Sequence, residues 1–209
     1  MQEFTRRLAA ATALAAVAIP AFAFGAAQQI EITDDQFTPQ KAPIVGAGTT
    51  SHSWQWLGDH AHNVRQDRRL FYSGPPAVDD TFLISASAGT FPYYCEIHGG
   101  PGTGMHGTLR IRPAQVAMKT KRGVIQIGVR WAPDSPQTGD QFDVQYRVEQ
   151  GDWKSWRKNT SKTEASFGSN DNPVDVKPGK TYRFRARSEV ASNPSRASAF
   201  SPPLVVVPG

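Results

Sequence analysis

The chain has 209 residues, of which 39% are hydrophobic and 20% charged, and its formal net charge is +5 at pH 7. These values describe a soluble globular protein of one large or two ordinary domains and exclude a chain embedded in a membrane throughout its length. The chain contains one cysteine, which excludes an internal disulfide.

The N-terminus has the pattern of an export signal. Arg6 and Arg7 precede an uncharged apolar run from Leu8 to Phe24, and small residues follow that suit a signal peptidase. We therefore expect residues 1–26 to be removed and the protein to be periplasmic or extracellular, with no transmembrane segment after cleavage. A retained N-terminal anchor is the alternative. The adjacent arginines are too common in signals to fix the export route.

The rest of the chain predicts an all-β fold. Apolar residues recur at every second position, and turn-forming Gly, Pro, Ser and Asn separate these short runs. Two β-sandwiches fit this pattern, with domains at residues 28–113 and 114–209. The charge also divides there: the first range holds 6 Lys and Arg against 8 Asp and Glu (net −2), and the second holds 15 against 9 (net +6).

The first domain contains four side chains that bind soft or borderline metals. Cys95 and His98 are three residues apart, and Met105 follows after a glycine-rich loop. His62, which Asn63 follows, supplies a second imidazole. A lone cysteine is often a small core residue, and a histidine at a strand end is often a surface residue. The occurrence of all four in one short domain nevertheless predicts a metal site.

The donor types favour copper over zinc. A thiolate, two imidazoles and a weak thioether suit both oxidation states of copper, whereas zinc prefers four strong donors and binds Met poorly. Zinc is the minor alternative. His60 and His106 adjoin predicted ligands, and we expect both to be exposed and not to bind the metal.

Residues 28–113 resemble the plastocyanin-like cupredoxins, which are blue, type 1 copper proteins. The matching segments are residues 37–39 (Phe-Thr-Pro), 46–50, 62–64 (His-Asn-Val), 89–95 and Met105-x-Gly107. The resemblance implies a Greek-key sandwich, with His62, Cys95 and His98 as equatorial ligands and Met105 as the axial ligand. It also implies that Asn63 steadies the ligand loops. Residues 51–54 (Ser-His-Ser-Trp) are more polar than the strand expected there.

The resemblance implies a carrier of single electrons between redox partner proteins. No Ser/His/Asp set, pair of catalytic carboxylates or phosphate loop is recognisable, so no catalytic turnover is expected. The His60-Ala61-His62 pair also looks like the paired histidines of multicopper oxidases, but the five histidines of this chain are too few for a trinuclear copper cluster. Two alternatives stay open. One is copper storage or delivery, and the other is an adhesion or docking subunit with an accessory copper domain.

Residues 114–209 resemble a fibronectin type III domain, an immunoglobulin-like sandwich. The resemblance rests on Trp131, Tyr146, Trp153-x-x-Trp156 and the run 177–187, in which a Pro-Gly corner precedes Tyr182. Such domains are usually interaction or spacing modules. Arg183, Arg185 and Arg187 alternate with inward residues, so we expect an exposed basic row. This row would suit an acidic protein, a polysaccharide or an anionic lipid surface, and no nucleic acid partner is expected.

Overall fold

The computed structural model describes residues 28–48, 51–169 and 174–209. The predicted export signal at residues 1–26 lies outside this range. Within it, nothing forms a helix with the length and apolar character needed to span a bilayer.

The first eight strands are β1 (Gln28–Thr33), β2 (Gln36–Thr38), β3 (Lys41–Gly46), β4 (Ser51–Trp56), β5 (Arg65–Gln66), β6 (Thr81–Ser85), β7 (Gly89–Gly100) and β8 (Thr103–Arg112). The next eight are β9 (Ala114–Lys121), β10 (Val124–Arg130), β11 (Gln141–Val148), β12 (Lys154–Thr160), β13 (Glu164–Phe167), β14 (Tyr182–Val190), β15 (Asn193–Ala197) and β16 (Leu204–Val206).

The first eight strands form two four-stranded sheets, in the orders β2-β1-β4-β6 and β3-β8-β7-β5. β1 is parallel to β4 and β3 is parallel to β8, while the other pairings are antiparallel. Aromatic rings join the two sheets: the Trp54 ring of β4 meets the Tyr93 ring of β7 edge-on, with the centroids 5.3 Å apart. His52 also belongs to the buried face of β4, with 1% of its surface exposed.

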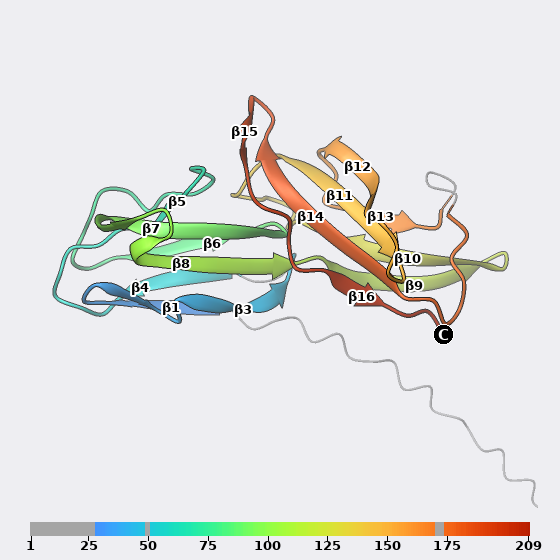
Figure 1. The fold of residues 1–209 in the computed structure, drawn as a ribbon, viewed down its shortest axis with the longest axis horizontal. Coiled ribbons are helices and arrows are strands. Elements are labelled where there is room, and N and C mark those ends of the chain that lie inside the picture. The colour runs from blue at the N-terminus through green and yellow to red at the C-terminus, as the bar shows by residue number, and fades with distance from the viewer. Residues whose placement is uncertain (1–27, 49–50, 170–173) are drawn as a thin grey trace, which may run out of the picture.

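The last eight strands form a second sandwich, from the orders β13-β10-β9 and β12-β11-β14-β15, with β16 beside β14. The predicted alternation of buried residues is confirmed in β14, where Tyr182, Phe184 and Ala186 are buried and the residues between them are half-buried. In β11, Phe142 and Val144 are buried as predicted, but Asp143 between them is also buried. The predicted tyrosine corner is also present, because the backbone N–H of Lys177 donates to the Tyr182 hydroxyl over 2.8 Å. The predicted all-β fold with two β-sandwiches is confirmed (Figure 1).

The chain passes from one sandwich to the other between β8 and β9, where the predicted boundary at 113 and 114 falls. Whether each part folds alone stays a prediction. The sandwiches are also joined by hydrogen bonds. The N–H of Ala88 donates to the carbonyl of Trp131 (2.6 Å), and Thr90 and Ala199 exchange two backbone bonds (3.0 and 3.2 Å). Ala88 and Trp131 are fully buried, so breaking this junction would leave buried backbone groups without partners.

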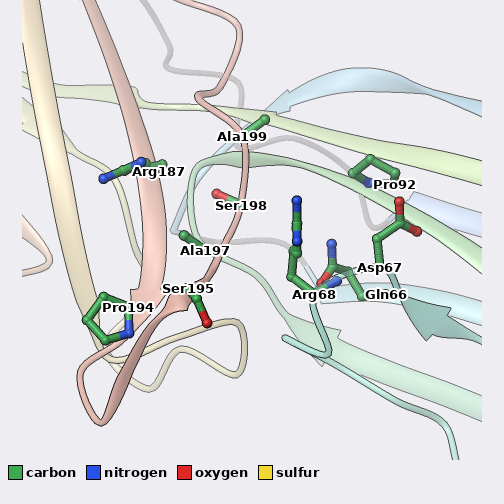
Figure 2. Close-up of a pocket in the computed structure, with 10 residues that line it drawn as sticks. All are labelled: Gln66, Asp67, Arg68, Pro92, Arg187, Pro194, Ser195, Ala197, Ser198 and Ala199. Atoms are coloured by element: carbon green, nitrogen blue, oxygen red, sulfur yellow. Dashed lines mark hydrogen bonds between the residues drawn. The ribbon is translucent and has the colours of Figure 1, made fainter. Parts of the chain in front are cut away.

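A cleft of about 470 Å³ lies along this junction (Figure 2). One wall is the loop from Gln66 to Arg68, and the other is the segment from Pro194 to Ala199. The Arg196 guanidinium donates to the backbone carbonyls of Arg68 and Arg69. The cleft is lined by Pro92 of β7, three residues before Cys95, and by none of the four predicted metal ligands.

Candidate metal centre

His62 is held by its backbone in the loop between β4 and β5. Its N–H and carbonyl both pair with Ala77, over 2.8 and 2.9 Å, and its carbonyl also accepts from the indole N–H of Trp56 (2.9 Å). The side chain has no exposed surface. Burial lowers the pKa of His62, and the neighbouring His98 lowers it further. Asp35 and Asp34 raise this pKa but do not outweigh the lowering effects, so the neutral imidazole, which is the form that binds metals, is favoured.

An irregularity in the pairing of β7 with β8 places the other predicted ligands together. Tyr94 pairs with His106 and Gly99 pairs with Gly104, so four residues of β7, from 95 to 98, stand opposite the single residue Met105 of β8. Such a bulge bends the strand and redirects its side chains. It brings both Cys95 and His98 to the end of the sandwich at which His62 lies.

Glycine is needed at the β8 side of this irregularity. Gly104 has a φ of +60°, and a Cβ placed on it would lie 2.5 Å from the carbonyl oxygen of His98. Any other residue would therefore push β8 away from the bulge. The glycine-rich loop between His98 and Met105 returns the chain tightly, as the sequence predicted.

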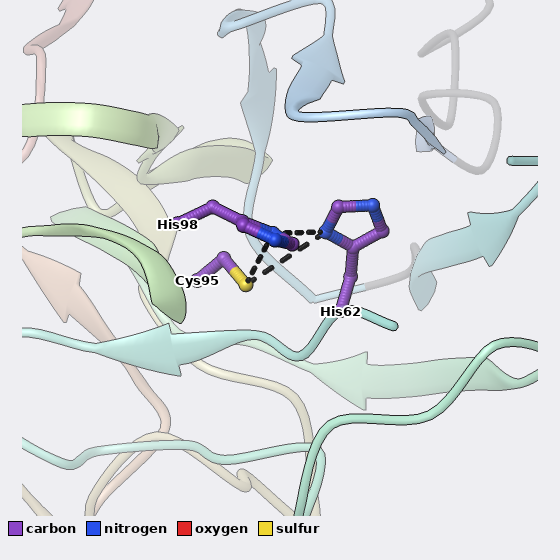
Figure 3. Close-up of side chains that lie close together, drawn as sticks. All are labelled: His62, Cys95 and His98. Carbon is purple, nitrogen blue, oxygen red and sulfur yellow. Dashed lines mark hydrogen bonds between the residues drawn. The ribbon is translucent and has the colours of Figure 1, made fainter. Parts of the chain in front are cut away.

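The structure brings His62, Cys95 and His98 together (Figure 3). The two Nδ1 atoms are 3.0 Å apart, and Cys95 Sγ lies 3.8 Å from Nδ1 of His62 and 3.7 Å from Nδ1 of His98. The point equidistant from these three atoms is about 2 Å from each, close to metal bond lengths to imidazole nitrogen and thiolate sulfur. The three donors therefore fit a transition metal without rearrangement. Cys95 is fully buried, so an ion bound there would be shielded from water on that side.

Met105 is buried, with 3% of its surface exposed, at the position of β8 that faces the bulge. Its role as the axial ligand stays a prediction. His106, the next residue, lies on the other face of β8, where Gly104 O is 2.9 Å from its Nδ1 and Gln40 Nε2 is 3.2 Å from its Nε2. It takes no part in the group, and it is half-buried rather than exposed as predicted.

Asn63 connects the His62 loop to β7 through Glu96. The N–H of Glu96 donates to Asn63 Oδ1 (2.9 Å), and Asn63 Nδ2 donates to Glu96 Oε2 (2.7 Å). The Arg65 guanidinium pairs with the other carboxylate oxygen of Glu96. Asn63 is fully buried. Glu96 and Arg65 are additions to the predicted set, and no motif in the sequence points to their pairing.

An acidic group flanks the exposed side of the site. Asp35 Oδ1 lies 3.4 Å from Nδ1 of His98 and 3.6 Å from Nδ1 of His60. The His60 side chain is 57% exposed, as predicted for it, and the His60 N–H donates to Asp34. This bond lowers the pKa of Asp34. Asp34, His60 and His62 form a second cluster of possible donor atoms, which shares His62 with the first.

The predicted arginine row on β14 is less exposed than expected. Arg187 pairs with Asp143 (2.7 Å), and Arg185 donates twice to Gln145 Oε1 (2.7 and 2.9 Å). The three arginines, Arg183 included, are half-buried rather than exposed. Strand alternation does place the three arginines on one face. It does not reveal that Asp143 and Gln145 of the neighbouring strand β11 bind two of them.

Comparisons with protein-family models and with curated protein sequences found no match. Solved structures do match. A reduced-state mutant of amicyanin is 22% identical and aligns with 41% of this chain and 81% of its own length, with a TM-score of 0.33. A two-domain fibronectin type III segment of chicken tenascin is 16% identical over 75% of this chain and 90% of that one (TM-score 0.31). A multicopper oxidase is 11% identical and aligns with 87% of this chain and 88% of its own length, with a TM-score of 0.30.

Identities and TM-scores this low say nothing about function. The evidence for a metal centre is the arrangement of His62, Cys95 and His98 in this chain.

Proposed function

We propose that this chain binds one copper ion through His62, Cys95, His98 and Met105, and that it carries single electrons between redox partner proteins outside the cytoplasm. The observation that supports the proposal best is the meeting of two Nδ1 atoms and one Sγ atom within 4 Å at the bulge of β7. The predicted export signal at residues 1–26 supports the location.

The donor set favours copper. Two imidazoles, one thiolate and one buried thioether make a site of mixed softness that suits copper in both oxidation states. A site with Met as its fourth donor is weak for zinc, which prefers strong donors at all four positions. The three nitrogen and sulfur donors are already within bonding range of one point, so little motion is needed to bind the ion.

When bound, copper supplies a one-electron change of oxidation state. The chain supplies the rest. Cys95 must lose its proton to bind, so metal uptake releases a proton at Sγ. The backbone bonds of His62 and the side chain of Asn63 hold the ligand loops in one arrangement, and burial of Cys95 keeps water away from the sulfur. Fixed, dry ligands keep reorganisation small, and this makes electron exchange fast.

The proposal includes no catalytic turnover. The second candidate is copper storage or delivery, which the exposed flank of the site favours. Asp35 and His60 lie beside His98 at the surface, where they could receive an ion that leaves the three-donor group. Reversible one-electron cycling with slow loss of the metal would support the carrier, and loss of the metal on each reduction would support copper handling.

The test is the visible absorption spectrum of the protein loaded with Cu(II), recorded before and after a mild reductant. An intense thiolate-to-copper charge-transfer band that bleaches and returns is expected. Cys95→Ser should abolish the band, and His106→Asn, on the opposite face of β8, should leave it unchanged. Met105→Leu should keep the band and raise the reduction potential, because a lost donor destabilises Cu(II) more than Cu(I). A Cys95→Ser protein that retains the band would refute the ligand assignment.

A further inference from the structure

The outer face of β11 and β14 places arginines directly across from one another. Arg147 of β11 pairs in register with Arg183 of β14, and the next pair along this face is Gln145 with Arg185. Two like charges on opposed residues of neighbouring strands repel each other and destabilise the sheet. This face therefore carries three guanidinium groups at a cost in stability that neutral residues would not have.

These three arginines have no carboxylate within ion-pair distance among the described residues. Arg183 donates to the backbone carbonyl of Glu149 (2.7 Å), and Arg185 donates to the neutral Gln145. The Nε atom of Arg147 is buried and has no hydrogen-bond partner in the described part of the chain. Arg187 differs, because Asp143 and Glu189 lie 2.7 and 3.8 Å from it and neutralise it.

Aromatic rings hold the guanidinium groups in place. The Arg185 guanidinium carbon lies 4.2 Å from the centre of the Trp153 ring and 4.4 Å from that of Phe200. The Arg147 guanidinium lies 4.8 Å from the Trp153 ring. Stacking of this kind costs little side-chain entropy on binding, because the planar groups are already oriented. Burial lowers the pKa of Arg185, and the nearby charge of Arg147 lowers it further.

We propose that Arg147, Arg183 and Arg185, with Trp153 and Phe200, form a docking face for a carboxylate-rich segment of an acidic partner protein. We call this set the arginine face. A guanidinium group donates readily to the planar carboxylate group, and the stacked guanidinium groups of this face are already oriented. A bound acidic segment would relieve the repulsion that the face otherwise carries.

The composition of the face favours a protein over a polysaccharide or a lipid surface. Arginine and aromatic residues are enriched in protein interfaces and lysine is depleted, and the face contains arginines and two aromatic residues with no lysine. Val205 of β16, which is 51% exposed, stands in register beside Arg183 and adds apolar surface. A membrane-binding surface would instead be expected to carry flexible lysines beside the apolar residues.

The arginine face is fixed relative to the metal centre. Phe200 follows Ala199, which pairs with Thr90 of β7, and the Thr90 hydroxyl donates to the Phe200 carbonyl over 3.0 Å. β7 also carries Cys95. A partner docked on the face would therefore hold the first sandwich in one orientation.

The test is the binding of fluorescently labelled poly-L-glutamate to the metal-free full chain, followed by fluorescence anisotropy at low salt. Arg147→Gln/Arg183→Gln/Arg185→Gln should weaken binding by about tenfold or more. The control is Lys119→Gln/Lys121→Gln/Arg122→Gln, which removes the same charge from the exposed β9–β10 hairpin and should weaken binding by less than about twofold. Urea unfolding of each variant establishes that it is folded.

A second variant separates guanidinium recognition from charge. Arg147→Lys/Arg183→Lys/Arg185→Lys keeps the charge but not the fork, and it should lose most of the binding. Full binding by the lysine variant, equal losses in the hairpin control, or no binding by the unaltered chain would each overturn the proposal. Tighter binding of hyaluronate or of phosphatidylglycerol vesicles than of poly-L-glutamate would overturn the choice of a protein partner. The metal-free chain is used so that failure here leaves the copper proposal untouched.

Discussion

His52 makes the stability of the first sandwich depend on pH. It lies on the buried face of β4, in register with Ile84 of β6, and 1% of its surface is exposed. Its Nδ1 atom is buried and has no hydrogen-bond partner among the described residues. Burial lowers the pKa of His52 to about 4, from a usual value of 6.5, and no charged neighbour contributes to the shift.

The direction of the pH effect on stability follows from whether the folded or the unfolded chain binds the proton of His52. Below pH 6.5 the unfolded chain takes up a proton at His52, whereas the folded protein does so only near pH 4. The neutral ring therefore contributes stability that is fully present above pH 6.5 and is lost as the pH falls towards 4. A shift of this size corresponds to about 3 kcal/mol at most, a large share of the 5–15 kcal/mol that is typical of a whole protein.

The assay is urea unfolding of the metal-free protein at pH 7 and at pH 4, compared with the variant His52→Leu. Leucine has a similar volume, is apolar and cannot be protonated, so the variant should lose about 3 kcal/mol less than the unaltered chain between the two pH values. Other titrating groups, including His62, are common to both proteins and cancel in the difference. Equal losses in the two proteins would show that His52 is protonated in the folded state or is hydrated there, and would refute the reasoning.

Three further predictions concern the metal centre and its support. Asp35→Asn should raise the reduction potential of the copper-loaded protein by an amount on the order of 40 mV, because an exposed negative charge beside the site stabilises Cu(II); voltammetry that shows no shift would contradict this. Glu96→Ala should lower the free energy of unfolding by about 1–3 kcal/mol, because it leaves Asn63 and Arg65 without their shared partner. Glu96→Gln should lower the free energy of unfolding by less. Equal losses for the two variants in urea unfolding would contradict this prediction. Gly107→Ala should cost about 1–3 kcal/mol, because its Cβ would lie 2.5 Å from the buried Tyr93 ring, and an unchanged melting temperature would show that the ring can move.

The sequence predicts those parts of the fold that depend on local patterns. Period-two alternation identifies the inward faces of β11 and β14, because a strand turns successive side chains to opposite sides regardless of its partners. The Pro-Gly corner before Tyr182 identifies the hydroxyl that accepts from Lys177, since that bond spans only five residues. The proximity of His62 to Cys95 is not local, and the sequence predicts it only through a resemblance to a known family.

The features that the sequence misses depend on pairing between strands. The ion pair of Arg65 with Glu96 joins residues 31 apart, and β5 and β7 must lie side by side before it forms. From the sequence, Arg183, Arg185 and Arg187 are three equivalent charges. In the structure Asp143 of β11 forms an ion pair with Arg187 alone among the three. His52 is polar in sequence, and only the pairing of β4 with its neighbours buries it.

The metal centre is formed by the same pairing, and this has a consequence for metal binding. The His62 loop is held by Ala77 and Trp56, and the bulge of β7 is held by its pairing with β8 on either side of Met105. None of these bonds requires a metal. Many small metal domains are unfolded until the ion binds, because the ion supplies their folding energy. Here the hydrophobic core and the strand pairings supply that energy, so we expect the donors to be in place beforehand. At the proposed copper site, the free energy of binding would then be available to hold the ion, and the metal-free protein should remain folded when a chelator removes the copper.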